Sequence, residues 1–176
     1  MAQWVIDPDH SVAAFRIRHM MLCHVRGQFN RISGTIHFDA GRVGESSVEA
    51  AIEAASIYTG IPKRDEHLKS PDFFDTAGCP SITFKSTAVE KKGEGRLHVA
   101  GDLSIHCVTR SVSFEAEISG PVKSPFGDET TIGFAASLTI NRDDFGVSWN
   151  EVMEGGGLVV GKEVEISLDI EADLAE

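Results

Sequence analysis

Apolar and polar residues alternate one by one along most of the chain, which is the pattern of β-strands with one buried and one solvated face. Near the middle of the chain, for example, Val112 and Phe114 alternate with Ser113 and Glu115. The same alternation predicts strands at 13–18, 48–54, 82–88, 97–105, 112–118, 132–140 and 164–170. We therefore expect an all-β protein.

A further apolar segment, 22–38, is interrupted by Gly27 and Gly34. Glycines inside a strand pattern mark bulges or sharp bends, so this segment is predicted to be one strongly curved strand. Curvature of this kind is what a closing sheet requires. The turn regions between strands are short and rich in glycine, which makes consecutive strands antiparallel.

A short inserted helix is predicted at 62–70, because Pro62 suits a first helical position and Pro71 stops the helix. The chain shows no linker, low-complexity tract or internal repeat, so residues 1–176 are expected to form a single domain. About eight strands without covering helices must form a sandwich or a closed barrel, and the curved segment favours the barrel.

The predicted inward face mixes phenylalanines with small residues such as Ala50, Ala116 and Gly101. The other small inward positions are Ala54, Ser86 and Ala88. Small residues could leave an apolar cavity for a ligand, or they could interlock with the large ones and form a solid core. Alternation alone leaves both interpretations open.

Acidic and basic residues are distributed unevenly along the chain. The 176 residues include 16 Lys and Arg against 27 Asp and Glu, a net charge of −11, which argues against nucleic acid as a partner. From His10 to Phe38, however, there is no acidic residue, while Arg16, Arg18, Arg26 and Arg31 are present. This basic stretch could receive an anionic head group, or it could balance acidic neighbours across a sheet.

The cysteines Cys23, Cys79 and Cys107 are odd in number and far apart, so no disulfide framework or zinc site is predicted and a reducing compartment is expected. The first residues lack the apolar run of a secretory signal, and no run is long enough to span a membrane. These patterns predict a cytoplasmic protein without stable membrane insertion.

The motifs for chemistry are weak. The seven histidines lack metal-binding spacing, so no metal ligands and no catalytic residues are predicted. Residues 156–162 match a phosphate-binding loop by letter, but Glu163 replaces the magnesium-binding hydroxyl and a strand follows. We expect a protein that is not an enzyme and has no cofactor. A metal-dependent or hydrolytic enzyme using pocket histidines such as His19 or His67, and a solid barrel serving only as an interaction module, are the alternatives.

Several stretches together resemble a known family. They are VIDPDHS at 5–11, VRGQF at 25–29, RDEHLKSPDFFD at 64–75, PSITFKS at 80–86, GDLSIH at 101–106 and INRDDFG at 140–146. The chain resembles the YceI-like polyisoprenoid-binding proteins from Trp4 to about Ala172. One departure is Cys107, which stands where the family pattern has glycine and would narrow the pore if it faced inward.

The resemblance implies an extended, lipocalin-like antiparallel barrel of about eight strands. It also implies a long apolar pore that binds, transports or stores an isoprenoid-type lipid, such as a polyprenyl phosphate or a quinone, without catalysis and often in a homodimer. The pore is expected to be lined by Phe15, Ile17, Phe84, Leu103, Phe114 and Phe134. Leu68, Phe73 and Phe74 are expected to close one end, and His19, Arg26 and Arg142 to lie near the lipid head group.

Overall fold

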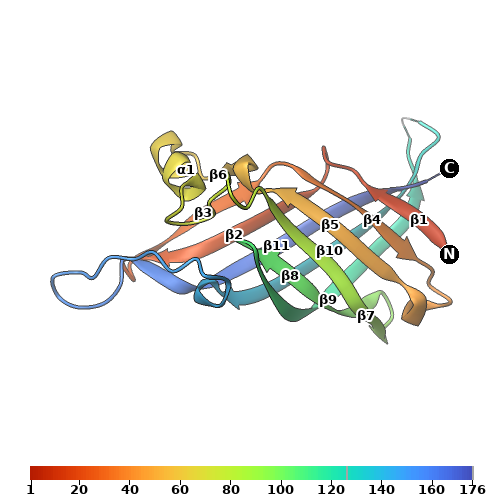
Figure 1. Cartoon of the computed structure of the whole chain (residues 1–176). Coiled ribbons are helices and arrows are strands. Elements are labelled where there is room, and N and C mark those ends of the chain that lie inside the picture. Colours follow the sequence, from red (N-terminus) through yellow and green to blue (C-terminus); the bar gives the residue numbers. More distant parts are fainter. Residues whose placement is uncertain (126, 176) are drawn as a thin grey trace.

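The computed structural model describes residues 1–125 and 127–175 and is dominated by one antiparallel sheet of eleven strands (Figure 1). The strands are β1 (Ala2–Ile6), β2 (Val12–His19), β3 (Cys23–Phe29), β4 (Ile32–Phe38), β5 (Ser47–Glu53), β6 (Ile57–Tyr58), β7 (Ser81–Gly93), β8 (Arg96–Ile105), β9 (Val108–Lys123), β10 (Thr130–Asn141) and β11 (Val160–Leu174). The helices are α1 (Pro62–Lys69) and the short 3₁₀ segments η1 (Val43–Glu45), η2 (Ala54–Ser56) and η3 (Arg142–Phe145).

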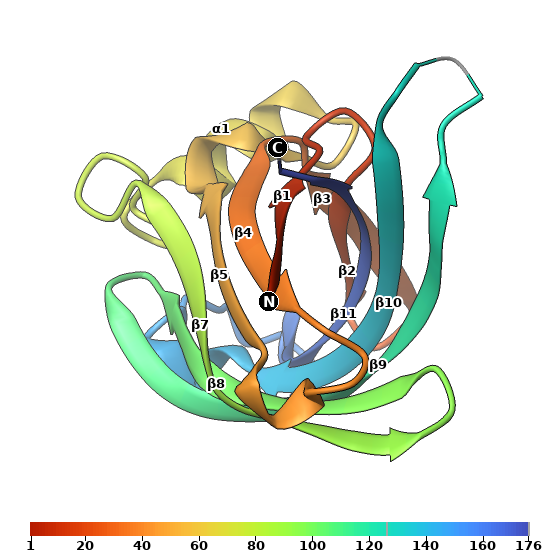
Figure 2. The same ribbon diagram turned by 90° about the vertical axis from the view of Figure 1, so that its right-hand side faces the viewer.

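The sheet closes into a barrel because β1 pairs with strands on both of its edges (Figure 2). Trp4 is in register with Ile36 of β4 and with Leu174 of β11. The closed ring contains eight strands in the order β1-β4-β5-β7-β8-β9-β10-β11. The earlier part of β11, between Val160 and Asp169, pairs with β2, and from β2 the sheet continues through β3 to β6. The predicted antiparallel barrel with one short helix is confirmed.

Every strand predicted from alternation is present, and the prediction missed β1 and the two-residue strand β6. The segment 22–38 forms β3 and β4, which are separated only at Asn30 and Arg31. Gly34 permits the close approach of β4 to β5, because a Cβ there would lie 2.3 Å from the Glu49 carbonyl oxygen. The prediction of a single curved strand was therefore wrong: the segment forms two strands, β3 pairing with β2 and β6, and β4 with β1 and β5.

A β-bulge in β7 corrects one detail of the predicted inward face. The pairing with β8 shifts between Ser86 and Ala88, so Ala88 turns outward and Val89 becomes buried. A strict period of two cannot report such an extra residue. Ala54 is buried as predicted, but it begins η2 and is not part of a strand.

Helix α1 is held against the barrel by a buried carboxylate. Asp65 accepts hydrogen bonds from the backbone N–H of Thr59 (2.9 Å) and from the Thr59 hydroxyl (2.5 Å). The Arg64 guanidinium donates to the Thr59 hydroxyl (2.7 Å) and to the Thr59 carbonyl oxygen (2.8 Å). We call α1 and the following residues to 80 the lid.

No helix among the described residues is long and apolar enough to cross a membrane.

The cysteine prediction was wrong. Cys79, at the end of the lid, forms a disulfide with Cys107, while Cys23 is free and exposed. The partners are 28 residues apart in sequence, and only the fold brings them together. His106 and Cys107 form the turn between β8 and β9 and do not lie within a strand. The expectation of a reducing compartment rested on unpaired cysteines, and Cys79 and Cys107 therefore do not support it.

Candidate ligand-binding cavity

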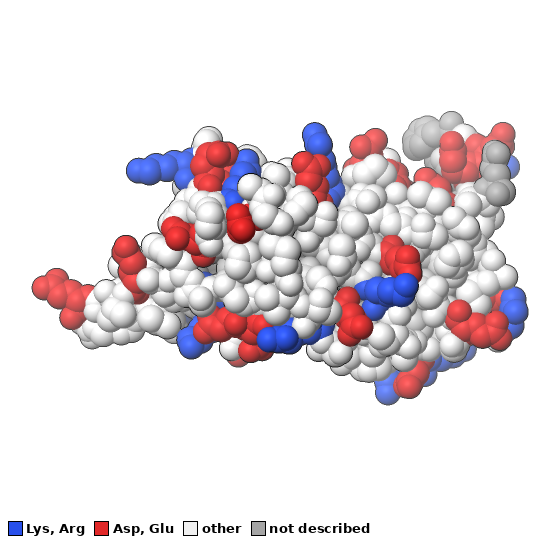
Figure 3. All heavy atoms as spheres, in the orientation of Figure 1, with Lys and Arg blue, Asp and Glu red and all other residues white. Residues whose placement is uncertain are grey.

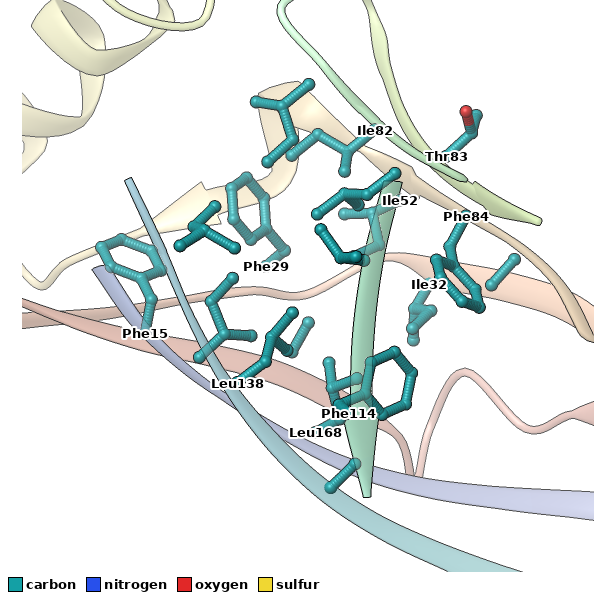
Figure 4. Close-up of a pocket in the computed structure, with 18 of the residues that line it drawn as sticks. Phe15, Phe29, Ile32, Ile52, Ile82, Thr83, Phe84, Phe114, Leu138 and Leu168 are labelled. Atoms are coloured by element: carbon teal, nitrogen blue, oxygen red, sulfur yellow. The ribbon is translucent and has the colours of Figure 1, made fainter. Parts of the chain in front are cut away.

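An elongated apolar cavity of about 270 Å³ lies inside the barrel (Figure 4). Its wall is made of inward side chains from the barrel strands, from β2 and β3, and from the lid. Pockets for small molecules commonly have volumes of about 300–1,000 Å³, so the cavity is slightly smaller than that range. The interior is therefore not a solid core.

The structure places every predicted pore residue on the cavity wall. These residues are Phe15, Ile17, Leu68, Phe73, Phe74, Phe84, Leu103, Phe114 and Phe134. They come from β2, from β7 to β10 and from the lid, so only the folded chain brings them together. Their predicted role in binding a ligand stays a prediction.

The cavity wall contains both aromatic rings and small residues. The rings of Phe84 and Phe114 are 5.5 Å apart, and those of Phe29 and Phe74 are also 5.5 Å apart. Gly101 makes room for Phe84, because a Cβ at this position would lie 2.5 Å from the Phe84 ring. The open volume adjoins Ala50, Ala116 and Ala136, whose short side chains leave the wall recessed between the rings.

The lid closes one end of the cavity with an aromatic cluster. The ring of Phe73 is 5.3 Å from that of Trp149, and the ring of His67 is 5.0 Å from Trp149 and 5.1 Å from Phe73. His67 Nε2 also lies 2.8 Å from a carboxylate oxygen of Asp72. Of these residues, Trp149 was not anticipated, because its contacts cross between segments distant in sequence.

Arg142 is the charged residue on the cavity wall, and it is only 5% exposed. Its guanidinium donates hydrogen bonds to the carbonyl oxygens of Gly161 (2.8 Å), Val147 (2.6 Å) and Val160 (3.5 Å). Burial lowers the pKa of Arg142, although an arginine remains protonated at physiological pH. Carbonyl oxygens satisfy donors without cancelling the charge, so the cavity carries a positive charge at this point.

The other two predicted head-group residues are not brought to Arg142. His19 ends β2 and is not on the cavity wall. Arg26 instead borders a separate, polar outer groove that also includes Arg16, Tyr58 and Glu165. In this groove a hydrogen bond from Arg16 holds the pKa of Glu165 below its usual range.

Other parts of the wall were missed by sequence reasoning. Phe29, Ile82 and Ile105 line the cavity, and their inward parity within the predicted strands was the signal that could have identified them. Val147 and Val160 also line it but lie outside the predicted strands, where no periodic signal exists.

Among the described residues, Asp7, His10 and Glu171 form the one group with ligand atoms close enough to hold a metal ion. His10 Nδ1 is 2.5 Å from Asp7, and this hydrogen bond raises the pKa of His10 and lowers that of Asp7. Asp7 and His10 lie at the bend between β1 and β2, Glu171 lies in β11, and none of the three lines the cavity. Ion pairing within the group accounts for its geometry without a metal.

Comparison with known proteins agrees with this architecture. The model of the YceI-like domain family matches residues 4–172. A UPF0312 protein of Staphylococcus aureus strain N315 is 32% identical over 176 residues, covering 100% of both chains. A UPF0312 protein of strain MW2 of the same species is equally similar, at 32% identity over 100% of both chains.

Solved structures share the fold. The crystal structure of Burkholderia cenocepacia BcnA superposes with a TM-score of 0.83 at 23% identity, covering 94% of this chain and 98% of that one. A Campylobacter jejuni YCEI protein gives a TM-score of 0.75 at 27% identity over 90% of each chain. A polyisoprenoid binding domain from Saccharophagus degradans gives 0.73 at 17% identity over 98% of each chain. By the extent of the family match and of its relatives, this chain belongs to the YceI-like family.

Proposed function

We propose that the protein is a non-enzymatic lipid-binding protein that encloses a long isoprenoid-type chain in its barrel. The observation that carries this proposal is the elongated apolar cavity, since an empty apolar cavity is costly unless an apolar ligand fills it. Family membership and the polyisoprenoid-binding relative in Saccharophagus degradans support the same ligand class.

The shape of the wall favours a branched chain. Rings such as Phe84 and Phe114 alternate along the wall with recesses at Ala116 and Ala136. An isoprenoid chain carries a methyl branch at regular intervals, and such recesses are places where branches can pack. Burial contributes about 25 cal/mol per Å² of apolar surface, so the tail would supply most of the affinity.

Arg142 favours an anionic head group over a neutral one. Its guanidinium donates hydrogen bonds to carbonyl oxygens, and the nearby Asp143 carboxylate is itself ion-paired with Lys162, so a phosphate or carboxylate near Arg142 would relieve an electrostatic cost. A polyprenyl phosphate therefore fits the cavity better than a quinone. Whether the protein stores or transports the lipid depends on its exchange rate, which transfer between vesicles would measure.

The alternatives receive less support. The candidate metal group of Asp7, His10 and Glu171 is on the outside of the barrel, away from the cavity. Of the histidines considered for catalysis, His19 is not on the cavity wall, and His67 packs between Phe73 and Trp149. A solid interaction module is hard to reconcile with the cavity.

The direct test is mass spectrometry of an organic extract of the purified protein, compared between Ala136→Phe and Ala135→Phe. Ala136 lines the cavity, whereas its neighbour Ala135 is exposed on the outer face of β10. We expect terpenoid masses in the wild-type extract. Losing space for about two methylene groups would cost ~1.6 kcal/mol, or about tenfold in lipid content, in Ala136→Phe only.

The controls decide between the outcomes. Ala135→Phe should retain its lipid, because the new ring projects into solvent. A wild-type extract without any apolar ligand would contradict the proposed function. Equal lipid content in both variants would place the ligand somewhere other than this cavity.

A further inference from the structure

The turn between β2 and β3 exposes apolar side chains where a hairpin ordinarily carries small polar ones. Met20, Met21 and Leu22 are 40%, 62% and 78% exposed. The Leu22 N–H donates to the His19 carbonyl oxygen (3.0 Å), and both central residues have positive φ, 51° for Met20 and 60° for Met21. This geometry favours asparagine and glycine.

Two methionines at these positions carry two separate costs. Their backbones adopt a conformation that L-residues with long side chains disfavour, and their side chains leave apolar surface in water. Burial does not offset either cost, because both side chains are exposed. Disfavoured backbone conformations collect at functional sites, so the turn is a candidate for contact with an apolar partner.

A second apolar loop adjoins this turn. The Met20 N–H donates to the Val159 carbonyl oxygen (2.7 Å), and the Val159 N–H donates to the Glu151 carbonyl oxygen (3.0 Å). These bonds place Val152, which is 77% exposed, in the loop next to the turn. We call Met20, Met21, Leu22 and Val152 the apolar tip.

The apolar tip lies at the lid end of the barrel, where the β2–β3 hairpin and the loop before β11 project at the left of Figure 1. Ile17 and Val160 follow closely behind it and line the cavity. His19, next to Met20, is in register with Val160. The apolar surface outside thus continues toward the apolar surface inside.

The hairpin behind the tip is basic. Arg18 and Arg26 are exposed on its outer face. Within the part of the chain that the structure describes, neither forms an ion pair, although Arg18 contributes to the lowered pKa of Glu165, with which Arg16 is paired. Glu151 and Glu154, on the loop that carries Val152, are the acidic residues beside the tip. On the face in Figure 3, acidic and basic side chains are scattered with uncharged surface between them.

We propose that the apolar tip docks on a membrane that contains anionic lipids. Met21 and Leu22 would insert at the boundary of head groups and acyl chains, a depth of roughly 5–10 Å. Arg18 lies two residues behind Met20, about 7 Å along the strand, where it would meet lipid phosphates. The net charge of −11 does not prevent docking, because salt screens charges more than about 8 Å away.

This docking surface gives the proposed cavity a source of ligand, and in that respect it rests on the proposed function. A long apolar chain could pass from the membrane toward Ile17 and Val160 without crossing open water. The test measures attachment of the protein to vesicles and does not depend on cargo, so the two ideas can fail separately.

The test is co-sedimentation with vesicles of phosphatidylcholine, with and without phosphatidylglycerol. The main variant combines Met20→Asn with Met21→Gly, which suits the turn and should raise the melting temperature. We expect its binding to vesicles to fall about tenfold despite the more stable fold. The matched control is Val122→Ser, because Val122 is also 62% exposed but lies in β9, away from the tip.

Charge variants test the role of the lipid head groups. Arg18→Gln should weaken binding to anionic vesicles about fivefold and leave binding to neutral vesicles unchanged. Glu154→Gln should strengthen binding to anionic vesicles. Docking would be overturned if the turn variant bound vesicles as the wild type does, or if Val122→Ser lost as much binding.

Two other outcomes would also overturn the proposal. If the wild type bound neither kind of vesicle but retained an extractable lipid, the docking proposal would be wrong and the proposed function would remain supported. If the turn variant abolished a concentration-dependent dimer in sedimentation and had no effect on vesicles, the tip would be an interface between copies of this chain. Vesicle binding without any extractable lipid would support docking and contradict the proposed function.

Discussion

The two tryptophans of the chain lie at opposite ends of the cavity and show how differently the ends are built. Trp4 is buried where β1 pairs with both β4 and β11, and it packs in a cluster with Ile36, Phe38 and Ala172. Trp149 is half-buried and packs against lid residues outside any strand. One end is held by strand pairing, and the other by side-chain contacts.

Backbone conformation separates the same two ends. Among the described residues, the non-glycine positions with positive φ are Met20, Met21, Asp75, His106 and Cys107. They lie in the β2–β3 turn, in the lid and in the β8–β9 turn, which is linked to the lid by the disulfide. The turn at the other end, between β7 and β8, uses Gly95 instead. Conformational cost is thus concentrated at the lid end of the barrel, the end at which we propose that a ligand enters.

The largest expected effect concerns the strand-paired end. Trp4→Ala should lower the free energy of unfolding by about 3–5 kcal/mol, because it removes a large buried ring. Urea denaturation measures this loss. Trp4→Phe is the control: it keeps a ring and removes an indole N–H that has no acceptor among the described residues, so it should cost much less. Equal losses in the two variants would contradict this account of the end.

At the lid end, the expected effect comes from a covalent link. Replacing both Cys79 and Cys107 by serine should lower the free energy of unfolding by about 3–4 kcal/mol, as expected for opening a loop of this length. Hydrogen exchange should accelerate in residues 70–80 and remain unchanged in β1. Cys23→Ser, at the free cysteine, should leave both measurements unchanged. Uniform acceleration across the barrel would remove the distinction between the ends.

The smallest expected effect lies at the bend between β1 and β2. Asp7 has a lowered pKa, so its stabilising contribution is present above the carboxyl's unfolded pKa and is lost as the pH falls. His10 has a raised pKa, so its contribution is complete below the unfolded imidazole pKa and is lost as the pH rises through the folded value. The pair therefore stabilises most in mildly acidic solution.

His10→Asn tests this window. Its melting temperature should be about one degree below that of the wild type near pH 5.5, and the difference should disappear near pH 8.5. A difference that did not change with pH would show that the ion pair is not its cause. Since the bend belongs to neither end of the cavity, ligand content should be the same in both proteins.

Alternation of residues was sufficient to predict most of the fold, because strands such as β10 and β11 are long and have one buried face. It failed where the period changes. The bulge before Ala88 reverses the faces of β7, and β1 is too short for its two buried residues, Trp4 and Ile6, to form a pattern. Strand pairing determines which residues of β1 and of β7 after the bulge are buried, and alternation in the sequence does not report strand pairing.

The cavity wall was predictable in part for the same reason. Phe84 and Phe114 point inward by parity, and Phe73 and Phe74 were suggested by their position after the helix-ending Pro71. The Cys79–Cys107 disulfide and the contacts of Trp149 were not predictable, because they join segments that meet only in the folded protein. The separation of Arg26 from Arg142 likewise depends on which face of the sheet each occupies.

The position of β1 between β4 and β11 has a consequence for biosynthesis. β1 is synthesised before the other strands of the barrel, but one of its two partners is the last of them, β11, at Ala172 and Leu174. The ring cannot close until β11 has emerged from the ribosome, so the apolar inner faces of the earlier strands remain uncovered until then. Nascent chains should therefore depend on chaperones, or on a lipid bound before the barrel closes, until β11 has paired with β1.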